Sequence, residues 1–226
     1  MHQNTLFAMN QNTLPKTRLF ENISESDLQS LLNCLGACER SYGKGEIIYH
    51  AGSCVDAMGL VLDGLVHISQ TDLWGNQNIF GQAGPGQVFA ETYACTPGEK
   101  MMVDVIAAKD SRILFLNVQK ILTTCPTACS FHSQLVSNLL AVMAVKNLQL
   151  SRKIHDISHK GIRERLLSYL SFEAVRHQSR TFEIPFNRQE LADYLCVDRS
   201  ALSNELSKMK KDGILTCTKN RFQLNC

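Results

Sequence analysis

The sequence lacks the features of a membrane or exported protein. No apolar run reaches the roughly 18 residues that a membrane-spanning helix requires. The N-terminal stretch contains neither the basic start nor the apolar core of a signal peptide. Hydrophobic residues make up 44% of the chain and charged residues 19%, which is typical of a globular protein rather than a disordered or fibrous one. We therefore expect a cytoplasmic protein with no membrane partner.

The chain has no C-x-x-C pair among its nine cysteines, although iron–sulfur and zinc sites usually show that clustering. In a cytoplasmic protein most of the cysteines should be reduced and behave as small buried apolar residues. Two pairs, Cys34/Cys38 and Cys125/Cys129, are spaced four residues apart, which on a helix would place both sulfurs on one face. A thiol- or metal-responsive role for these pairs is the alternative. No nucleophile–base constellation stands out, so we expect neither an enzyme nor a bound cofactor or metal.

An excess of charge of one sign is also lacking, because the net charge is only +2. The charge is unevenly distributed, however. Residues 158–226 contain 12 Lys and Arg against 8 Asp and Glu, a net charge of +4. A basic C-terminal part joined to a mildly acidic N-terminal part is typical of a polyanion-binding module attached to a second domain.

The stretch from Asn187 to Leu215 predicts two short amphipathic helices joined by a tight turn. Asn187 and Glu190 have the spacing of a capping box, and Asp198 is an N-cap candidate for the second helix. Gly213 is expected to end that helix in the left-handed conformation. The apolar positions that share the buried faces are Leu191, Leu195, Leu202, Leu206 and Met209. The pattern as a whole indicates a helix-turn-helix.

The polar residues near the start of the second helix have the chemistry needed to read bases. Arginine forms a forked pair of hydrogen bonds with guanine, asparagine pairs with adenine, and serine serves either base. The predicted base-contacting residues are Arg199, Ser200, Ser203 and Asn204. Arg188, Lys219 and Arg221 complete the predicted DNA contacts, with the last two at the tip of a C-terminal hairpin. The alternative is an ordinary charged surface of a small helical domain.

The N-terminal region predicts an arm and one helix. Residues 1–17 show no helical or strand periodicity and are interpreted as a flexible arm. A helix begins at Ser24 in a capping box with Asp27, and Gly36 weakens or ends it.

From Tyr42 to about Leu116 the character changes to short strands broken by turns. Asp63-Gly64 predicts a hairpin, and Trp74-Gly75-Asn76 predicts another turn. Several short strands at roughly 8–12-residue spacing indicate a sandwich or barrel, which can enclose a small ligand.

After Pro126 one long helix should run to about Ser158, with apolar residues at alternating spacings of four and three. The seam consists of Val136, Leu140, Met143, Asn147, Leu150, Ile154 and Ile157. Such a heptad seam requires a partner helix, and a buried Asn147 would favour a dimer in one register. The alternative is a single helix packed on its own barrel. Beyond the seam, Gly161 is a candidate hinge.

A barrel, a long seam helix, a hinge and a winged helix-turn-helix follow one another in this order, and the chain thereby resembles the CRP/FNR family of bacterial transcription regulators. The resemblance is most specific in RQELADYLCVDRSALSNELSKMKKDGIL and in GLVLDGLVHIS with GQVFAE. It implies an α+β fold with an N-terminal jelly-roll barrel like the cyclic-nucleotide-binding domains, a dimerisation helix and a C-terminal winged helix-turn-helix. The expected segments are an arm at 1–17, a sensing barrel at 18–125, a dimerisation helix at 126–158 and a DNA-binding domain at 159–226.

The resemblance also implies a homodimer on a palindromic operator in double-stranded DNA, with RNA polymerase as a further partner. Many members of the family carry Glu where this chain has Ser200 and Arg where it has Asn204. The operator should therefore differ from that of the best-known member. A protein-binding regulatory module with a degenerate helix-turn-helix is the competing interpretation.

The candidate effector site departs from the cyclic-nucleotide-binding relatives. Gly86 and Glu91 match those relatives, but Met101-Met102 replaces the Arg-Ser pair that holds the phosphate. A thioether cannot neutralise a phosphate, so a cyclic nucleotide is not the expected effector. A candidate apolar pocket for an uncharged or aromatic small molecule is lined by Phe89, Tyr93, Met101, Met102 and Leu150. The alternative is that these side chains simply fill the barrel.

Overall fold

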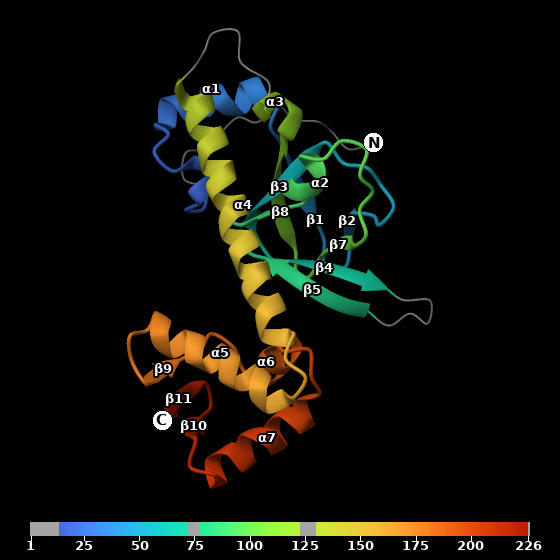
Figure 1. The fold of residues 1–226 in the computed structure, drawn as a ribbon. Coiled ribbons are helices and arrows are strands. Elements are labelled where there is room, and N and C mark those ends of the chain that lie inside the picture. Colours follow the sequence, from blue (N-terminus) through green and yellow to red (C-terminus); the bar gives the residue numbers. More distant parts are fainter. Residues whose placement is uncertain (1–13, 72–76, 123–129, 226) are drawn as a thin grey trace. The chain divides into compact units, whose positions relative to one another are not determined.

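The structure is a computed structural model that describes residues 14–71, 77–122 and 130–225 (Figure 1). The chain forms two compact units, Met1–Met143 and Ala144–Cys226, and the division falls inside the long helix α4 (Ser130–Ile157). Among the described residues, no helix has both the length and the apolar character needed to cross a membrane.

Two four-stranded antiparallel sheets form the first unit. In the first sheet the strand order is β1-β8-β3-β6, and in the second it is β2-β7-β4-β5. The strands of the first sheet are β1 (Cys38–Tyr42), β8 (Ser111–Asn117), β3 (Ala57–Asp63) and β6 (Val88–Phe89). Those of the second are β2 (Ile47–Tyr49), β7 (Asp104–Ala107), β4 (Val66–Thr71) and β5 (Gln77–Ala83). The predicted strands are present, and their arrangement in two facing sheets is a jelly-roll barrel.

The hairpin predicted at Asp63-Gly64 is wrong. A turn is present there, with Gly64 at φ +95°, but the strands on its two sides belong to different sheets. β3 pairs with β6 and β8, whereas β4 pairs with β5 and β7. Because both edges of β3 are already occupied by strands distant in sequence, β4 crosses to the second sheet instead of folding back. The turn predicted at Trp74-Gly75-Asn76 lies outside the described residues.

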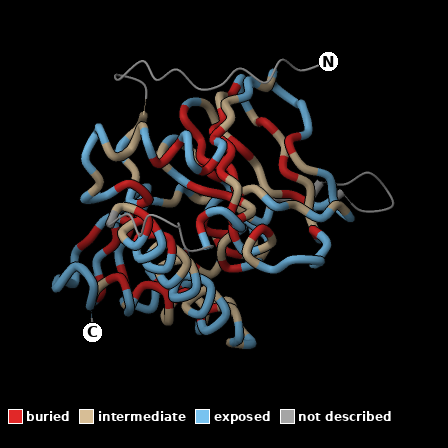
Figure 2. The backbone as a smooth tube through the Cα atoms, turned by 90° about the horizontal axis from the view of Figure 1, so that it is seen from above, coloured by how far each residue is buried: buried red, intermediate tan, exposed pale blue. Residues whose placement is uncertain are grey.

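The central strands β3 and β8 are buried on both faces, which explains their continuous apolar runs. One face contributes Leu60 and Leu114 to a core shared with the helices, and the other contributes Val61 and Ile113 to a core between the sheets. Figure 2 shows the buried segments in red, alternating with the exposed turns. A Cβ at Gly59 would overlap the Phe89 ring, so glycine allows the ring to lie against β3.

Short helices cover the outer face of the first sheet. They are a 3-10 helix (Arg18–Phe20), α1 (Glu25–Leu35), α2 (Glu91–Ala94) and α3 (Val118–Leu122). The predicted cap of α1 is confirmed, since the Ser24 side chain accepts a hydrogen bond from the Asp27 N–H, and Gly36 ends the helix at φ +63°. Of the predicted arm, residues 1–13 lie outside the described residues, while Leu14 packs against the core.

The second unit contains the predicted winged helix-turn-helix. Its elements are α5 (Ile162–Arg176), β9 (Thr181–Glu183), α6 (Arg188–Tyr194), α7 (Arg199–Lys211), β10 (Leu215–Thr218) and β11 (Arg221–Leu224). The three strands form one sheet in the order β10-β11-β9, and the helices pack on it around a single apolar core. The predicted α+β class, with a barrel, a long helix and a C-terminal winged helix-turn-helix, is confirmed.

Candidate nucleic-acid interface

Helix α6 begins with a complete capping box. The Asn187 Oδ1 atom accepts hydrogen bonds from the backbone N–H groups of Gln189 and Glu190, at 2.9 and 3.0 Å. The Glu190 carboxylate in turn accepts from the Asn187 N–H at 2.7 Å. Both interactions follow from the Asn-x-x-Glu spacing in the sequence. Leu191 is fully buried below the cap, which fixes the rotation of the helix about its axis.

The turn between α6 and α7 is held by an arginine from α5. The Arg165 guanidinium donates to the carbonyl oxygens of Leu195 and Cys196, at 2.9 and 3.2 Å. Its Nε atom donates to the His159 carbonyl at 2.8 Å. Cys196 itself has φ +53°, a conformation that most residues adopt only when their surroundings enforce it. The role of Arg165 could not be predicted from the sequence, because its partners in the turn, the Leu195 and Cys196 carbonyls, lie 30 and 31 residues away and leave no local pattern.

Asp198 is the N-cap of α7. Its side chain accepts from the N–H groups of Ser200 and Ala201, at 2.8 and 2.9 Å, and from the Ser200 hydroxyl. The Ser200 hydroxyl and these N–H groups lower the pKa of the Asp198 carboxyl below its usual value. The apolar face of α7 is buried as predicted, through Leu202, Leu206 and Met209. Gly213 follows at φ +71°.

The four predicted base-contacting residues lie at the start of α7 but differ in how they are engaged. Arg199, Ser200 and Asn204 are exposed, and Ser203 is half-buried. The Ser203 hydroxyl donates to the Arg199 carbonyl at 2.9 Å, and the Ser200 hydroxyl donates to Asp198. Both serine hydroxyls thus donate within the helix start, and the exposed Asn204 amide and Arg199 guanidinium can supply donors.

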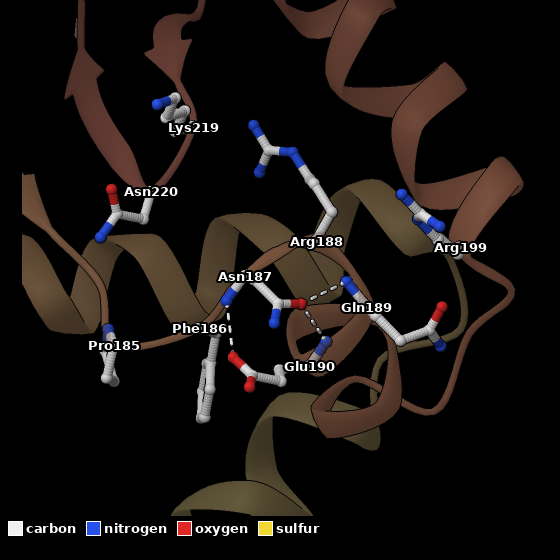
Figure 3. A pocket seen from close by; sticks show the side chains of 9 residues that line it. All are labelled: Pro185, Phe186, Asn187, Arg188, Gln189, Glu190, Arg199, Lys219 and Asn220. Atoms are coloured by element: carbon white, nitrogen blue, oxygen red, sulfur yellow. Dashed lines mark hydrogen bonds between the residues drawn. The ribbon is translucent and has the colours of Figure 1, made fainter.

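A cavity of about 690 Å³ opens beside this helix start. Its lining includes Arg188 from α6, Arg199 from α7 and Lys219 from the β10–β11 turn. In Figure 3 these three side chains lie on the other side of Asn187 from Glu190, whose carboxylate is engaged in the capping box. Three cations from three elements thus line one concave surface, which suits a phosphate group.

Arg188 is held in place by the wing. Its guanidinium lies 5.2 Å from the centroid of the Phe222 ring and donates to the Cys217 sulfur at 3.1 Å. Lys219 is exposed at the tip of the predicted hairpin, in the left-handed region at φ +52°. Arg221 is exposed at the start of β11, opposite Thr218, and is not among the residues that line the cavity.

The candidate effector residues fall into two environments. Phe89 and Met101 are buried in the core between the sheets, at 0% and 2% exposure, and Tyr93 packs against it. Met102 is 71% exposed, and its N–H donates to the Tyr93 hydroxyl at 3.3 Å. Glu91 is buried, Gly86 faces the Lys16 carbonyl, and Leu150 is exposed in the other compact unit. The structure therefore brings together only Phe89, Tyr93 and Met101 in one core.

Apolar seam positions of α4 are exposed in the single chain. Leu140, Leu150 and Ile154 have exposed fractions of 68, 61 and 63%. Of the remaining seam positions, Val136 and Asn147 are exposed, and Met143 and Ile157 are half-buried. Three large apolar side chains at heptad positions of α4 thus face solvent in the single chain.

Cys34 and Cys38 do not share a helix face, which the thiol- or metal-responsive alternative for this pair required. Cys34 lies on α1, but Cys38 lies on β1, because the helix ends at Gly36. Cys34 is exposed, and Cys38 is half-buried. The pair Cys125/Cys129 lies outside the described residues. Within the described part of the chain, no group of three or more His, Cys, Asp or Glu side chains has the geometry to hold a metal ion.

Comparison with known proteins assigns both units to described domain types. The family model of the cyclic nucleotide-binding domain matches residues 39–127, and that of the Crp-like helix-turn-helix domain matches residues 164–225. The transcriptional activator protein FnrL of Cereibacter sphaeroides is 25% identical over 192 residues, covering 78% of this chain and 71% of the relative. The cyclic AMP receptor protein of Thermus thermophilus is 26% identical over 178 residues, covering 78% of each chain.

Solved structures show the same fold at lower identity. CprK complexed with OCPA superposes with a TM-score of 0.63 at 16% identity, covering 83% of this chain and 86% of that one. The c-di-GMP-responsive global regulator CLP of Xanthomonas campestris gives a TM-score of 0.58 at 16% identity, covering 87% and 97%.

Proposed function

Since this chain belongs to the CRP/FNR family of bacterial transcription regulators, we propose that it binds a palindromic operator as a homodimer and thereby controls transcription. The observation that carries this proposal is the arrangement at the start of α7. Arg199 and Asn204 are exposed there, and a cavity lined by Arg188, Arg199 and Lys219 lies beside them. The exposed Arg199 and Asn204 side chains can read base edges, while Arg188 and Lys219 hold phosphates. Contact with RNA polymerase at the promoter is part of the same proposal.

Two features support the homodimer. The exposed apolar positions of α4 recur at heptad spacing, which is what a second copy of the same helix would cover. Asn147 interrupts this seam, and a polar residue at one such position selects register and oligomeric state. A twofold dimer would place its recognition helices on half-sites about one helical turn apart, roughly 34–36 Å.

The effector of this protein is proposed to be something other than a cyclic nucleotide. Met101 is buried in the core, and Met102 offers a thioether to solvent, so neither supplies a cation to a phosphate. The Phe89 ring lies against Gly59 and occupies space between the sheets. An uncharged or aromatic molecule beside Tyr93 fits these side chains better, because burying an unpaired anion is costly.

The proposed mechanism is a shift between two populations of the dimer. A signal at the barrel changes the packing of the α4 helices, and the relative pose of the two recognition helices changes with it. A thiol-responsive regulator of the same architecture is the second candidate, because Cys34 is exposed on α1.

Selection of bound duplexes from a random library tests the proposed function. The purified protein should enrich one palindromic sequence, and sedimentation of the same sample should give a dimer. A monomer that retains no duplex at low ionic strength, whether oxidised or reduced, would rule out the proposal. Equal DNA affinity before and after oxidation would rule out the thiol-responsive alternative.

Addition of cyclic AMP or cyclic GMP tests the effector proposal separately. Neither should change the DNA affinity or the thermal stability of the protein. A shift in the melting temperature on titration with either nucleotide would contradict the proposal, because a ligand that binds the folded state stabilises it.

A further inference from the structure

Asp156 occupies an unfavourable position unless it has partners elsewhere. It lies in the last turn of α4, where the helix dipole is negative, and its carboxylate is fully buried. A buried carboxylate at the C-terminal end of a helix is retained only where hydrogen bonds and a cation compensate for the lost water. The partners of Asp156 therefore show what this position does.

Three side chains from three helices converge on Asp156. Arg152, one turn earlier on α4, forms an ion pair with it at 2.7 Å. The Ser168 hydroxyl on α5 donates to its Oδ1 atom at 2.6 Å, and the Tyr194 hydroxyl on α6 donates to its Oδ2 atom at 3.1 Å. One carboxylate thus joins the end of the long helix to the first helix of the helix-turn-helix.

The surroundings make this junction persistent. Burial, and to a lesser extent the neighbouring Asp156 carboxylate, raise the pKa of Tyr194 above its usual value, so its hydroxyl remains a donor. Arg152 also donates to the Ser168 carbonyl at 2.6 Å, and its guanidinium lies 4.3 Å from the centroid of the Phe172 ring. Arg165 on α5 adds a second link, because its guanidinium donates both to the His159 carbonyl and to the Leu195 carbonyl in the turn between α6 and α7.

These contacts restrict the hinge that the sequence suggested at Gly161. Gly161 is the N-cap of α5 at φ −97°, an ordinary extended conformation. Asp156 precedes Gly161 in the chain and Ser168 follows it, and a hydrogen bond joins their side chains. Rotation about Gly161 would therefore break the bonds of a buried carboxylate.

We propose that Asp156 is a positioning residue for DNA recognition, which fastens α6 to the last turn of α4 so that the recognition helix moves with the dimerisation helix. This inference rests on the proposed function, because it holds that Asp156 helps to set the spacing between the two recognition helices of a dimer. A movement of α4 then reaches α7 as a rigid-body displacement, without a flexible joint between them.

Hydrogen exchange of the intact protein tests whether the junction exists. The Tyr194→Phe variant removes one hydroxyl and keeps the ring, and Asp156→Asn removes the charge. Both should raise the exchange rate of the amides in residues 150–157 about tenfold or more, because a hydrogen bond to a buried charge is lost. Tyr169→Phe is the matched control, since its ring is buried 5.2 Å from that of Tyr194 in the same aromatic cluster. Exchange in Tyr194→Phe that equals the Tyr169→Phe control would overturn the inference.

Binding to two duplexes tests the positioning role itself. On the selected palindrome, Tyr194→Phe should bind about tenfold more weakly than the wild type, whereas on a duplex with one half-site it should stay within about twofold. An equal loss on both duplexes would overturn the inference, because it would show that Tyr194 only supports the folding of the helix-turn-helix. Absence of any DNA binding by the wild type would refute the proposed function and the DNA-positioning role, and the exchange measurement would still decide whether the helices are joined.

Discussion

Arg188, the first residue of α6, donates a hydrogen bond to the sulfur of Cys217 on β10, with nitrogen and sulfur 3.1 Å apart. The same guanidinium lies over the ring of Phe222 on β11. The wing therefore does more than present its own tip residue, because its two strands determine the direction of an arginine on another element. We expect the phosphate contact of Arg188 to depend on both residues.

Substitution of Arg188 by alanine should weaken binding equally on all sequences. A phosphate contact carries no base information, so the affinities for the selected operator and for random DNA should fall by the same factor. The slope of the logarithm of affinity against the logarithm of salt concentration should decrease by about one. Fluorescence titrations at several salt concentrations measure both quantities. A loss confined to the operator would contradict this assignment.

Cys217→Val should produce a smaller version of the same defect. Valine fills a similar volume but accepts no hydrogen bond, so the guanidinium keeps only the Phe222 ring as support. Affinity should fall several-fold on all duplexes with little change in melting temperature. Cys217→Ser, which retains an acceptor, is the matched control and should bind more tightly than Cys217→Val. Equal affinities of the two variants would show that the sulfur does not orient Arg188.

Substitution of Arg199 by alanine should act differently from that of Arg188. The residue is exposed at the start of α7, where a guanidinium can form a forked pair of hydrogen bonds with guanine. The loss on the cognate operator should be about 1–3 kcal/mol, and selection should become indifferent at one base position of each half-site. Competition assays with operators altered at single positions measure this change. An equal loss on random DNA would show that Arg199 contacts phosphate alone.

The elements of the helix-turn-helix could be predicted because their signals are local. The Asn187 and Asp198 caps and the glycine at 213 each act within one turn of the chain. The hairpin at Asp63-Gly64 could not be predicted, since the pairing of β3 depends on β6 and β8, which lie about 25 and 50 residues further on. Sequence alone identified the turn but not the sheets that it connects.

The contacts that position the site could not be predicted from the sequence for the same reason. Arg188 and Cys217 are separated by 29 residues, and Asp156 and Tyr194 by 38. Of these residues, only Asp156 is unusual in the sequence itself, because an acidic side chain near the C-terminal end of a helix is repelled by the negative end of the helix dipole. Such a conflict indicates that a partner exists without indicating which residue it is.

The N-cap of α7 should make the stability of the second unit depend on pH in the acid range. The folded-state pKa of Asp198 is lowered, first by the Ser200 hydroxyl and then by backbone N–H groups. The cap therefore stabilises the fold at pH values above the unfolded pKa of about 3.9, and this contribution is lost as the pH falls through the lower folded pKa. Asp198→Asn keeps an acceptor but does not titrate. The difference in melting temperature between the wild type and this variant should shrink between about pH 5 and pH 3. A constant difference would contradict the role of the charge.

Glutamate substitutions at Leu150 and Leu148 test whether two chains associate through the heptad seam of α4 or through any exposed apolar residue of this helix. They are 61% and 70% exposed, and only Leu150 lies on the heptad seam. Leu150→Glu would place two carboxylates at facing positions of a dimer, which should raise its dissociation constant by roughly a hundredfold or more. Leu148→Glu should leave the dimer intact, because the side chain remains in water. Sedimentation measures both constants, and the palindrome affinity should fall only for Leu150→Glu. Asn147→Leu provides the opposite change, since it removes the polar residue from the seam and should tighten association while allowing higher oligomers. If both glutamate variants sediment as dimers, then a surface other than this seam holds the two chains together.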